Sequence, residues 1–364
     1  MKARAGKVPL VIVGAGKVAR TIHLPIWKRT KQVEIVAVCD VNKDVAKNLA
    51  KEYSIPYVYE SLEEMLEEWR GGTMIVDICT PAPTHASLSI AAMRRGHHVL
   101  LEKPMATSIE ECEQILREYQ ARRNEVKLCV IHNFLFDPPM LKVRELAKED
   151  EILGVEIHML HTPEDEMLSD PNHWIHSLPG GRFGENLIHP IYFLRNLIGP
   201  LKLRDLYVTK RGRYEWVKFD ELWATFTSNG GRYGVVHVSF NSPRWTADFS
   251  INIYGKRSIV KYDGSNFTLI KQGTLMKGFI YTERIPKLKV AWDCVACGLQ
   301  AIKTPFDVWS KLLLKRWTPG HEVVFRSFLK ALLNNTELPY PPEEAFESTK
   351  TFLEVIAELS HYEA

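Results

Sequence analysis

The chain has 364 residues, a length that suits two hydrophobic cores, because single cores rarely grow past roughly 250–300 residues. Hydrophobic residues make up 45% of it and charged residues 25%, as in ordinary globular proteins, and the net charge of +3 does not indicate nucleic-acid binding. The sequence has neither a signal-peptide pattern nor an apolar run of membrane-spanning length, so we expect a cytoplasmic protein.

The first 130 residues alternate between short apolar runs and helix-like stretches. Such runs are typical of strands buried on both faces, and their alternation with helices predicts a parallel sheet. Strands are expected at 8–13, 33–39, 74–79, 97–101 and 126–131, and helices at 17–28, 43–53, 61–69, 84–95 and 108–122. We therefore predict an α/β fold that begins with a doubly wound parallel sheet over residues 1–130.

From about residue 150 the expected strands follow one another with few helices between them. They lie at 151–161, 203–210, 222–227, 233–240, 249–254 and 258–262, with a hairpin turn at 229–231 and one long helix at 183–198. This order predicts an α+β substrate domain with a mostly antiparallel open sheet over residues 131–320. Helices expected at 321–334 and 343–360 form a last segment, 321–364, which we expect to pack back on the N-terminal domain.

The first expected strand runs directly into a glycine turn that reads Gly-Ala-Gly-Lys-Val-Ala. In such a turn Gly14 permits the tight bend, Gly16 lets the backbone approach a pyrophosphate, and Ala19 lets the helix pack closely on the strand. The helix start at Lys17 and Val18 then offers N–H groups and a partial positive charge to the phosphates. The order of strand, turn and helix predicts a dinucleotide site, so we expect residues 1–130 to be a dinucleotide-binding domain of the Rossmann type.

The second indication of a dinucleotide is Asp40, which closes the second expected strand about 20 residues after the glycines. A carboxylate there can bind the ribose 2′-OH and would repel a 2′-phosphate, so NAD is favoured over NADP. The nearby Lys43 weakens this preference, and NADP stays possible. A structural alternative is that Asp40 only caps the next helix.

Two further segments, residues 77–85 (DICTPAPTH) and 96–104 (GHHVLLEKP), make the pattern specific. Together with the glycine turn they resemble the glucose–fructose oxidoreductase and inositol dehydrogenase family, called Gfo/Idh/MocA, and the likeness covers nearly the whole chain. The resemblance implies two sets of cofactor contacts: a loop against the nicotinamide half, and a strand-end pair beside the nicotinamide and the substrate. The first comprises Thr80, Pro81 and His85, the second Glu102 and Lys103, and the resemblance also implies a cis bond before Pro104.

The family's second motif, Gly-Gly…Asp-x-Gly-x-His, is similar to residues 180–189, which end in His189. Glu185 stands for the usual Asp and reaches further, and Leu187 stands for the usual Gly and narrows the space near the helix. After the sixth strand the family often has Tyr-Asn-x-Arg-Phe. Here Asn133 is present but Leu135 replaces the Arg, so a cationic contact to a carboxylated or phosphorylated substrate is expected to be missing.

The implied reaction is hydride transfer between a nicotinamide and a carbinol carbon, and it needs a group that takes up and returns the hydroxyl proton. Lys103 and His189 are the candidates, because a partly desolvated lysine and a histidine can both titrate near neutral pH. We expect His189 to accept the proton and Lys103 to bind the hydroxyl and relay it, with the reverse assignment left open. Glu185, one helical turn before His189, is expected to orient or charge this pair.

Two other segments are candidates for binding. The residues expected to line the substrate mouth are Asn133, His173, Trp174 and His176, since sugars pack on indole faces and bond to imidazoles; for Trp174, anchoring a loop is an equal alternative. Residues 305–317 are basic and aromatic, which leaves open a membrane surface, another subunit, or a helix packed on the domain edge. Cys294 and Cys297 form a lone CxxC pair, and we expect no metal site in the chain.

Three functions fit these motifs. The first is an NAD(P)-dependent dehydrogenase acting on a sugar, cyclitol or nucleotide-sugar, a small-molecule partner that the resemblance implies. The second is an enzyme that retains NAD and rearranges or cleaves a glycoside by transient oxidation. The third is a non-catalytic nucleotide-sensing protein. We also expect a homo-oligomer formed through the C-terminal sheet, because an exposed sheet face usually pairs with another subunit.

Overall fold

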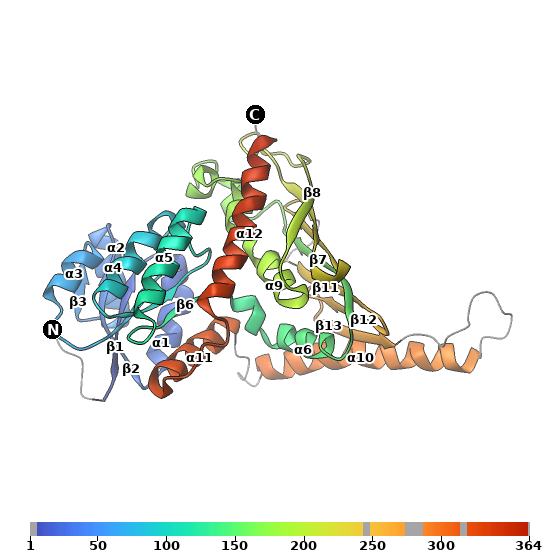
Figure 1. Cartoon of the computed structure of the whole chain (residues 1–364), viewed down its shortest axis with the longest axis horizontal. Helices are drawn as coiled ribbons and strands as arrows, with labels where there is room; N and C mark the ends of the chain where they lie inside the picture. The colour runs from blue at the N-terminus through green and yellow to red at the C-terminus, as the bar shows by residue number, and fades with distance from the viewer. Residues whose placement is uncertain (1–5, 243–247, 274–286, 314–318, 363–364) are drawn as a thin grey trace. The chain divides into compact units, whose positions relative to one another are not determined.

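A computed structural model describes residues 6–242, 248–273, 287–313 and 319–362. The chain divides into two compact units (Figure 1). Unit 1 comprises Met1–Asn133 and Gly320–Leu353, and unit 2 comprises Phe134–Pro319 and Glu354–Ala364. The C-terminal part of the chain therefore completes the first unit before the last residues return to the second.

Unit 1 is built on a six-stranded sheet in the order β3-β2-β1-β4-β5-β6, with every pair parallel. Its central strands are buried on both faces, as their continuous apolar runs require. The order reverses between β1 and β4, and the carboxyl ends of the strands on either side of such a reversal are where α/β sheets bind ligands. The strands are β1 (Val8–Val13), β2 (Val33–Cys39), β3 (Tyr57–Tyr59), β4 (Ile75–Ile78), β5 (His98–Leu101) and β6 (Leu128–Val130).

The helices of unit 1 begin where the sequence offers caps. The Ser61 and Ser108 hydroxyls accept hydrogen bonds from the N–H groups three residues on, and Asn42 accepts two at the start of its helix. The helices are α1 (Leu24–Arg29, preceded by the π-helical turn η1, Ala19–His23), α2 (Lys43–Tyr53), α3 (Leu62–Glu68), α4 (His85–Arg94, preceded by η2, Ala82–Thr84), α5 (Ile109–Arg122) and α11 (Gly320–Asn334). The helix α12 (Pro342–His361) contributes its residues up to Leu353 to this unit.

Unit 2 is built on a seven-stranded sheet in the order β13-β12-β11-β7-β10-β9-β8 (Figure 1). Only the β7–β10 pair is parallel, and all other pairs are antiparallel. The strands are β7 (Ile152–Leu160), β8 (Lys202–Thr209), β9 (Glu221–Thr227), β10 (Tyr233–Ser239), β11 (Asp248–Gly255), β12 (Ser258–Asp263) and β13 (Thr268–Gly273). The short turn η5 (Asn229–Gly231) makes the β9–β10 hairpin that the sequence predicts.

One face of this sheet packs on the helix α9 (Ile188–Ile198), and the strands alternate accordingly. Val236 and Val238 are buried while the intervening His237 is half-buried, and Leu194 of α9 lies so close to Gly234 that an added Cβ would meet its side chain at 2.6 Å. The other helices of unit 2 are α6 (Pro138–Ala147), α7 (Glu166–Ser169), α8 (Arg182–Asn186) and α10 (Lys287–Leu313), with the turns η3 (Asn133–Phe136, which opens on the last residue of unit 1) and η4 (Trp174–Ser177).

The predicted fold class is confirmed: a parallel α/β sheet and a second, mostly antiparallel sheet. Several elements differ from the prediction. The three-residue β3, the helix α6 and the edge strand β13 were not expected, and α10 begins well before the segment 305–317. The helix expected at 183–198 is α8 followed by α9, with Leu187 between them in helical conformation. In the described part of the chain no helix is long and apolar enough to cross a membrane.

Candidate functional site

The glycine turn after β1 has the shape that a dinucleotide requires. Gly14 has a φ of +95°, and a Cβ on it would lie 2.9 Å from the backbone carbonyl of Cys79, so only glycine fits. At Gly16, by contrast, a Cβ would meet no atom within 4 Å, and the residue is exposed. The backbone beside Gly16 therefore has room for a phosphate group at the start of the helical stretch.

Asp40 follows β2 and braces this turn. One of its carboxylate oxygens accepts a hydrogen bond from the Ala15 N–H at 2.7 Å, and the other accepts from the Asn42 N–H at 2.8 Å. The cap of α2 is Asn42, so the alternative in which Asp40 caps that helix is wrong. Lys43 forms an ion pair with Glu60 at 2.8 Å, and that partner's hydrogen bond and charge raise the pKa of Lys43. The positive charge that weakened the NAD preference is thus already compensated.

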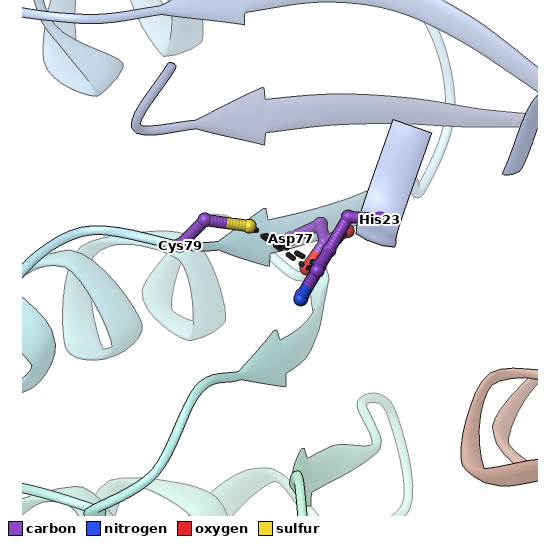
Figure 2. Close-up of side chains that lie close together, drawn as sticks. All are labelled: His23, Asp77 and Cys79. Carbon is purple, nitrogen blue, oxygen red and sulfur yellow. Dashed lines mark hydrogen bonds and ion pairs between the residues drawn. The ribbon is translucent and has the colours of Figure 1, made fainter. Parts of the chain in front are cut away.

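A buried polar network that the sequence pattern did not predict lies beneath the ends of β4 and β5. His23 reaches from η1 to Asp77 of β4, with its Nδ1 at 3.0 Å from both carboxylate oxygens (Figure 2). Its Nε2 lies 3.0 Å from Glu102 Oε1. The Trp27 indole N–H donates to Asp77 at 2.6 Å, and Cys79 Sγ lies 3.2 Å from His23 Nδ1. All five side chains are buried.

The charges in this network fix its protonation. Burial alone would lower the pKa of His23, but the Asp77 carboxylate, the Cys79 thiol and their hydrogen bonds raise it well above its ordinary value. Burial would raise the pKa of Glu102, but the hydrogen bond and charge of His23, with smaller contributions from His321 and Lys103, lower it to about 2. His23 is therefore an imidazolium held between two carboxylates.

His23, Asp77 and Cys79 also form a group of possible metal ligands, with ligand atoms within 4.8 Å of one another. No such group was expected from the sequence. The same atoms already make the hydrogen bonds described above, and the second His23 nitrogen is bonded to Glu102. We therefore interpret the cluster as a hydrogen-bonded network (Figure 2).

The network ends at the Glu-Lys-Pro turn after β5. Glu102 Oε2 accepts a hydrogen bond from the Lys103 backbone N–H at 3.2 Å, and His321 of α11 lies 3.8 Å from Glu102 Oε1. The Lys103–Pro104 peptide bond is cis, as the resemblance implies. The side chain of Glu102 is thus directed into the protein, where it braces the backbone that carries Lys103. Contact of Glu102 with a cofactor stays a prediction.

His85 ties two loops together. Its Nδ1 lies 2.8 Å from the Pro104 carbonyl and its Nε2 lies 2.9 Å from the Thr80 carbonyl. The ring is buried, and burial lowers its pKa despite the two carbonyls. Thr80 also accepts a hydrogen bond from the Thr84 hydroxyl at 2.7 Å. A neutral imidazole has one N–H, so His85 donates to one of the two carbonyls and lies in contact with the other, between the loop at Thr80 and Pro81 and the turn at Pro104. Its predicted contact with the nicotinamide is untested.

In unit 2, His189 lies in the first turn of α9, where two aromatic residues orient it. Its Nδ1 lies 2.9 Å from the Tyr192 hydroxyl, which also accepts a hydrogen bond from the Phe134 N–H at 3.1 Å. The Phe134 ring stacks on the imidazole with centroids 4.4 Å apart. A neutral ring that donates from Nδ1 to Tyr192 carries its lone pair on Nε2, which is the form a proton acceptor needs.

Glu185 lies in α8 and pairs with Arg182, a buried arginine that was not among the predicted site residues. Arg182 also donates to the Asp165 carboxylate, at 3.0 Å from Nε and 2.7 Å from Nη2. Next to this group Asn186 Nδ2 lies 2.7 Å from His161 Nε2, and burial followed by the charge of Arg182 lowers the pKa of His161 to about 4. The Glu185 carboxylate is therefore already in an ion pair with Arg182, and its predicted action on His189 stays a prediction.

The remaining predicted site residues have local roles. His173 Nδ1 accepts a hydrogen bond from the Ile175 N–H at 3.3 Å, and His176 Nε2 lies 3.0 Å from the Asp170 carbonyl, so both rings shape the loop around η4. Trp174 in that turn is exposed, which fits a substrate contact better than a buried anchor. Asn133 is buried.

Two departures from the family pattern fall on core positions. Leu135 is fully buried and its carbonyl accepts a hydrogen bond from Arg144 Nη1 at 2.9 Å, and Leu187 is fully buried as well. Both side chains therefore belong to the hydrophobic core of unit 2. The side chain of Cys294 and residues 314–317 of the basic segment lie outside the described residues.

The N-terminal part of the chain matches a known protein family, and proteins of several bacteria resemble it in sequence. Residues 8–132 match the Gfo/Idh/MocA family model, described as "Oxidoreductase family, NAD-binding Rossmann fold". The uncharacterised oxidoreductase YrbE of Bacillus subtilis is 23% identical over 268 residues, 72% of this chain and 76% of that protein. The myo-inositol 2-dehydrogenase of Thermotoga maritima is 25% identical over 188 residues, and the D-glucoside 3-dehydrogenase of Escherichia coli 28% identical over 144 residues. The chain covers 54% and 40% of the lengths of these last two proteins.

Solved structures resemble the chain over almost its whole length. The WlbA dehydrogenase from Bordetella pertussis, solved with NADH and UDP-GlcNAcA, aligns with a TM-score of 0.76 and 19% identity over 98% of this chain and 97% of that one. UDP-N-acetylglucosamine 3-dehydrogenase GnnA from Acidithiobacillus ferrooxidans aligns with a TM-score of 0.70 and 18% identity over 96% and 97%. At these identities the likeness shows a common fold for both units.

Proposed function

The chain belongs to the Gfo/Idh/MocA oxidoreductase family through its NAD-binding Rossmann domain, and on that premise we propose that it transfers a hydride between NAD and a carbinol carbon of a sugar, cyclitol or nucleotide-sugar. The observation that carries the proposal is the pairing of a glycine turn open at Gly16 with a Lys103 backbone braced from beneath by a buried ion network. Bound NAD supplies the hydride acceptor, and the protein supplies position and proton transfer.

The residues of the glycine turn suit NAD. Gly16 leaves space for the pyrophosphate, and two backbone N–H groups hold the Asp40 carboxylate after β2, the position from which an acidic residue binds the ribose 2′-OH in this fold. A 2′-phosphate at this place would face the same carboxylate, while Lys43 is engaged by Glu60. We therefore propose NAD as the preferred cofactor.

Lys103 and His189 are proposed as the proton-transfer groups. Lys103 would bind the substrate hydroxyl through its ammonium group. The buried Glu102 carboxylate accepts a hydrogen bond from the Lys103 backbone N–H and so fixes the point from which that side chain extends. His189, oriented by Tyr192 and by the Phe134 ring, would accept the hydroxyl proton as the hydride leaves and return it in the reverse reaction. The reverse assignment, with Lys103 as the proton acceptor, stays open.

The substrate class rests on the relatives. An inositol dehydrogenase and a glucoside dehydrogenase are among the sequence relatives, and dehydrogenases of nucleotide-linked sugars share the whole fold. The exposed Trp174 supports a sugar ring as the ligand, since indole faces pack on sugars. We propose a neutral polyhydroxylated ring as the reacting part of the substrate, because a leucine is buried at position 135 where the family often has arginine.

The test is a panel of polyols, free sugars and nucleotide-sugars, assayed for reduction of NAD and of NADP by absorbance of the reduced cofactor. We expect Lys103→Met and His189→Asn to lower kcat by about 10²–10⁴-fold with little change in NAD affinity. Lys127→Met is the matched control, because Lys127 is a half-buried lysine just before β6, at the amino end of the strand next to β5, whereas Lys103 follows the carboxyl end of β5.

Two outcomes would contradict the proposal. Turnover that persists at the wild-type rate in both variants would remove the assigned proton-transfer groups. Conversion of a glycoside by protein to which no cofactor was added, with no net NADH formed, would point instead to the enzyme that retains its NAD. Asp40→Ser checks cofactor choice separately, with the ratio of kcat/KM for NAD over NADP expected to fall by at least about tenfold.

A further inference from the structure

The helix α10 carries a continuous row of exposed apolar side chains, which we call the outer stripe. Its members follow one another at alternating steps of four and three residues, so they share one side of the helix. Each is between 54% and 67% exposed, far above what a core position shows. The outer stripe consists of Val295, Leu299, Ile302, Phe306, Trp309 and Leu313.

The opposite side of α10 is already used. The Gln300 side chain accepts a hydrogen bond from the Lys271 N–H of β13 at 2.8 Å, and Gln272 of the same strand donates to Cys297 Sγ at 3.6 Å. Val308 is buried on this side. The helix therefore lies along the edge strand (Figure 1) with its outer stripe directed away from its own sheet. Exposed apolar patches of this extent usually mark a binding surface.

The charge of α10 distinguishes between two occupants of the outer stripe, a second copy of this chain and a lipid bilayer. Residues 287–313, the span of α10, contain four lysines against two aspartates, a net charge of +2. Stripe-to-stripe pairing of two copies would bring two such positive segments together. A bilayer that contains anionic lipid would attract the same charges. Charge complementarity therefore favours a lipid surface.

The residues that flank the outer stripe give a second reason. A coiled-coil seam is normally flanked by oppositely charged side chains that select its partner. Of the six residues that flank the outer stripe in sequence only Lys303 is charged. Most of the others are apolar, so the apolar side of the helix is wider than the narrow seam of a coiled coil. Phe306 and Trp309 within the stripe are side chains favoured at membrane interfaces. The flanking residues are Ala296, Lys303 and Ser310 on one side and Gly298, Pro305 and Leu312 on the other.

We propose that the outer stripe docks this protein on the surface of an anionic lipid bilayer, with α10 lying in the plane of the interface. The proposal is independent of the cofactor and of the substrate, because it rests on α10 and β13 alone. Binding should combine insertion of the stripe with attraction of the basic side chains, and so should weaken as salt is added.

The experiment is co-sedimentation of the full chain with vesicles of phosphatidylcholine alone and of phosphatidylcholine with roughly 30% phosphatidylglycerol. We expect binding to the anionic vesicles to be at least about tenfold stronger at low salt. Leu299→Asn, Ile302→Asn and Phe306→Asn together should abolish it. The matched control is Leu333→Asn on α11, because Leu333 is 55% exposed, like the members of the stripe, but lies on another helix.

The oligomeric state is measured on the same samples by analytical ultracentrifugation, and circular dichroism confirms that each variant is folded. Equal binding of the wild type and the triple variant would overturn the proposal, and so would failure of the wild type to bind anionic vesicles. A dimer that the triple variant converts to monomer, without lipid binding, would overturn it in favour of a second copy on the outer stripe. NADH formation is assayed in parallel, so a failure of the proposed function is seen separately.

Discussion

Removal of the buried imidazolium of His23 tests whether its charge stabilises the Glu102 carboxylate beneath the Glu-Lys-Pro turn. His23→Leu deletes charge-assisted bonds to Asp77 and Glu102, each 3.0 Å long, and leaves two carboxylates in the interior. Such bonds contribute about 1.5–3 kcal/mol each, and breaking a buried ion pair from one side costs about 3–5 kcal/mol. We expect a loss of about 4 kcal/mol at pH 6.5, which corresponds to a urea midpoint lower by more than about 1 M.

The pH dependence of this loss has a defined sign. In the wild type the lowered pKa of Glu102, about 2, contributes stability that is fully present above the ordinary value of 4.5 and is lost as the pH falls towards 2. Without His23, burial should raise the pKa of Glu102 above its ordinary value, so the folded variant takes up a proton as the pH is lowered. Above pH 6.5 the raised pKa of His23 makes the wild type itself lose stability as the pH rises, so the two proteins are compared below that value. The stability difference between wild type and variant should be smaller at pH 5 than at pH 6.5.

The assay is urea denaturation of the full chain followed by circular dichroism, with the transition of unit 1 identified as the one that added NAD shifts. His98→Leu is the matched control, because it removes one neutral hydrogen bond, from the Lys127 N–H at 3.0 Å. Adding Glu102→Gln to His23→Leu should recover part of the loss, since one uncompensated charge disappears. Strict additivity of the two changes, or a loss below about 1 kcal/mol for His23→Leu, would refute the imidazolium assignment.

Three further predictions concern the turn, the second unit and acid. Gly14→Ala should lower both thermal stability and NAD affinity, because its Cβ would lie 2.9 Å from the Cys79 backbone, whereas Gly16→Ala should lower NAD affinity alone; calorimetry and a thermal melt separate the two. Arg182→Met should destabilise the protein by about 2–4 kcal/mol, since it removes both N–H groups that donate to Asp165 Oδ2; a urea midpoint unchanged from wild type would contradict this. Burial lowers the pKa of His132 and His161 to about 4, so the unfolded chain binds more protons than the folded chain between pH 6.5 and 4. Stability should therefore fall as the pH is lowered through that window, which urea midpoints measured at stepped pH will test.

The sequence predicted the parallel sheet well because its strands have a continuous apolar signal. The expected bounds of 8–13 and 33–39 agree with β1 and β2, since both strands are buried on two faces. The strand β3 was missed because three residues, Tyr57–Tyr59, are too short to show a period. The helix α10 was recognised only near its end, because Pro305 lies inside it and its apolar residues are on the exposed side.

The ion network was missed for a different reason. A lone histidine in an apolar helix, such as His23, gives no periodic signal. Asp77 did carry one: it is a charged residue in the middle of the apolar run Ile75–Ile78, and a carboxylate buried in a central strand must find a partner. The partner is 54 residues away in the sequence, so the need for it could be inferred but its identity could not.

The stacking of Phe325 on Trp27 has a consequence for how the protein is made. Their rings lie 4.8 Å apart and nearly parallel, and Phe325 also contacts the His23 ring edge-on at 4.8 Å. Because α11 belongs to the same compact unit as the first 133 residues, ribosomes must synthesise residues 134–319 before that unit can close around His23. Until α11 has been synthesised, the core of the nascent N-terminal region is incomplete. Expression of residues 1–133 alone is therefore expected to yield aggregated protein.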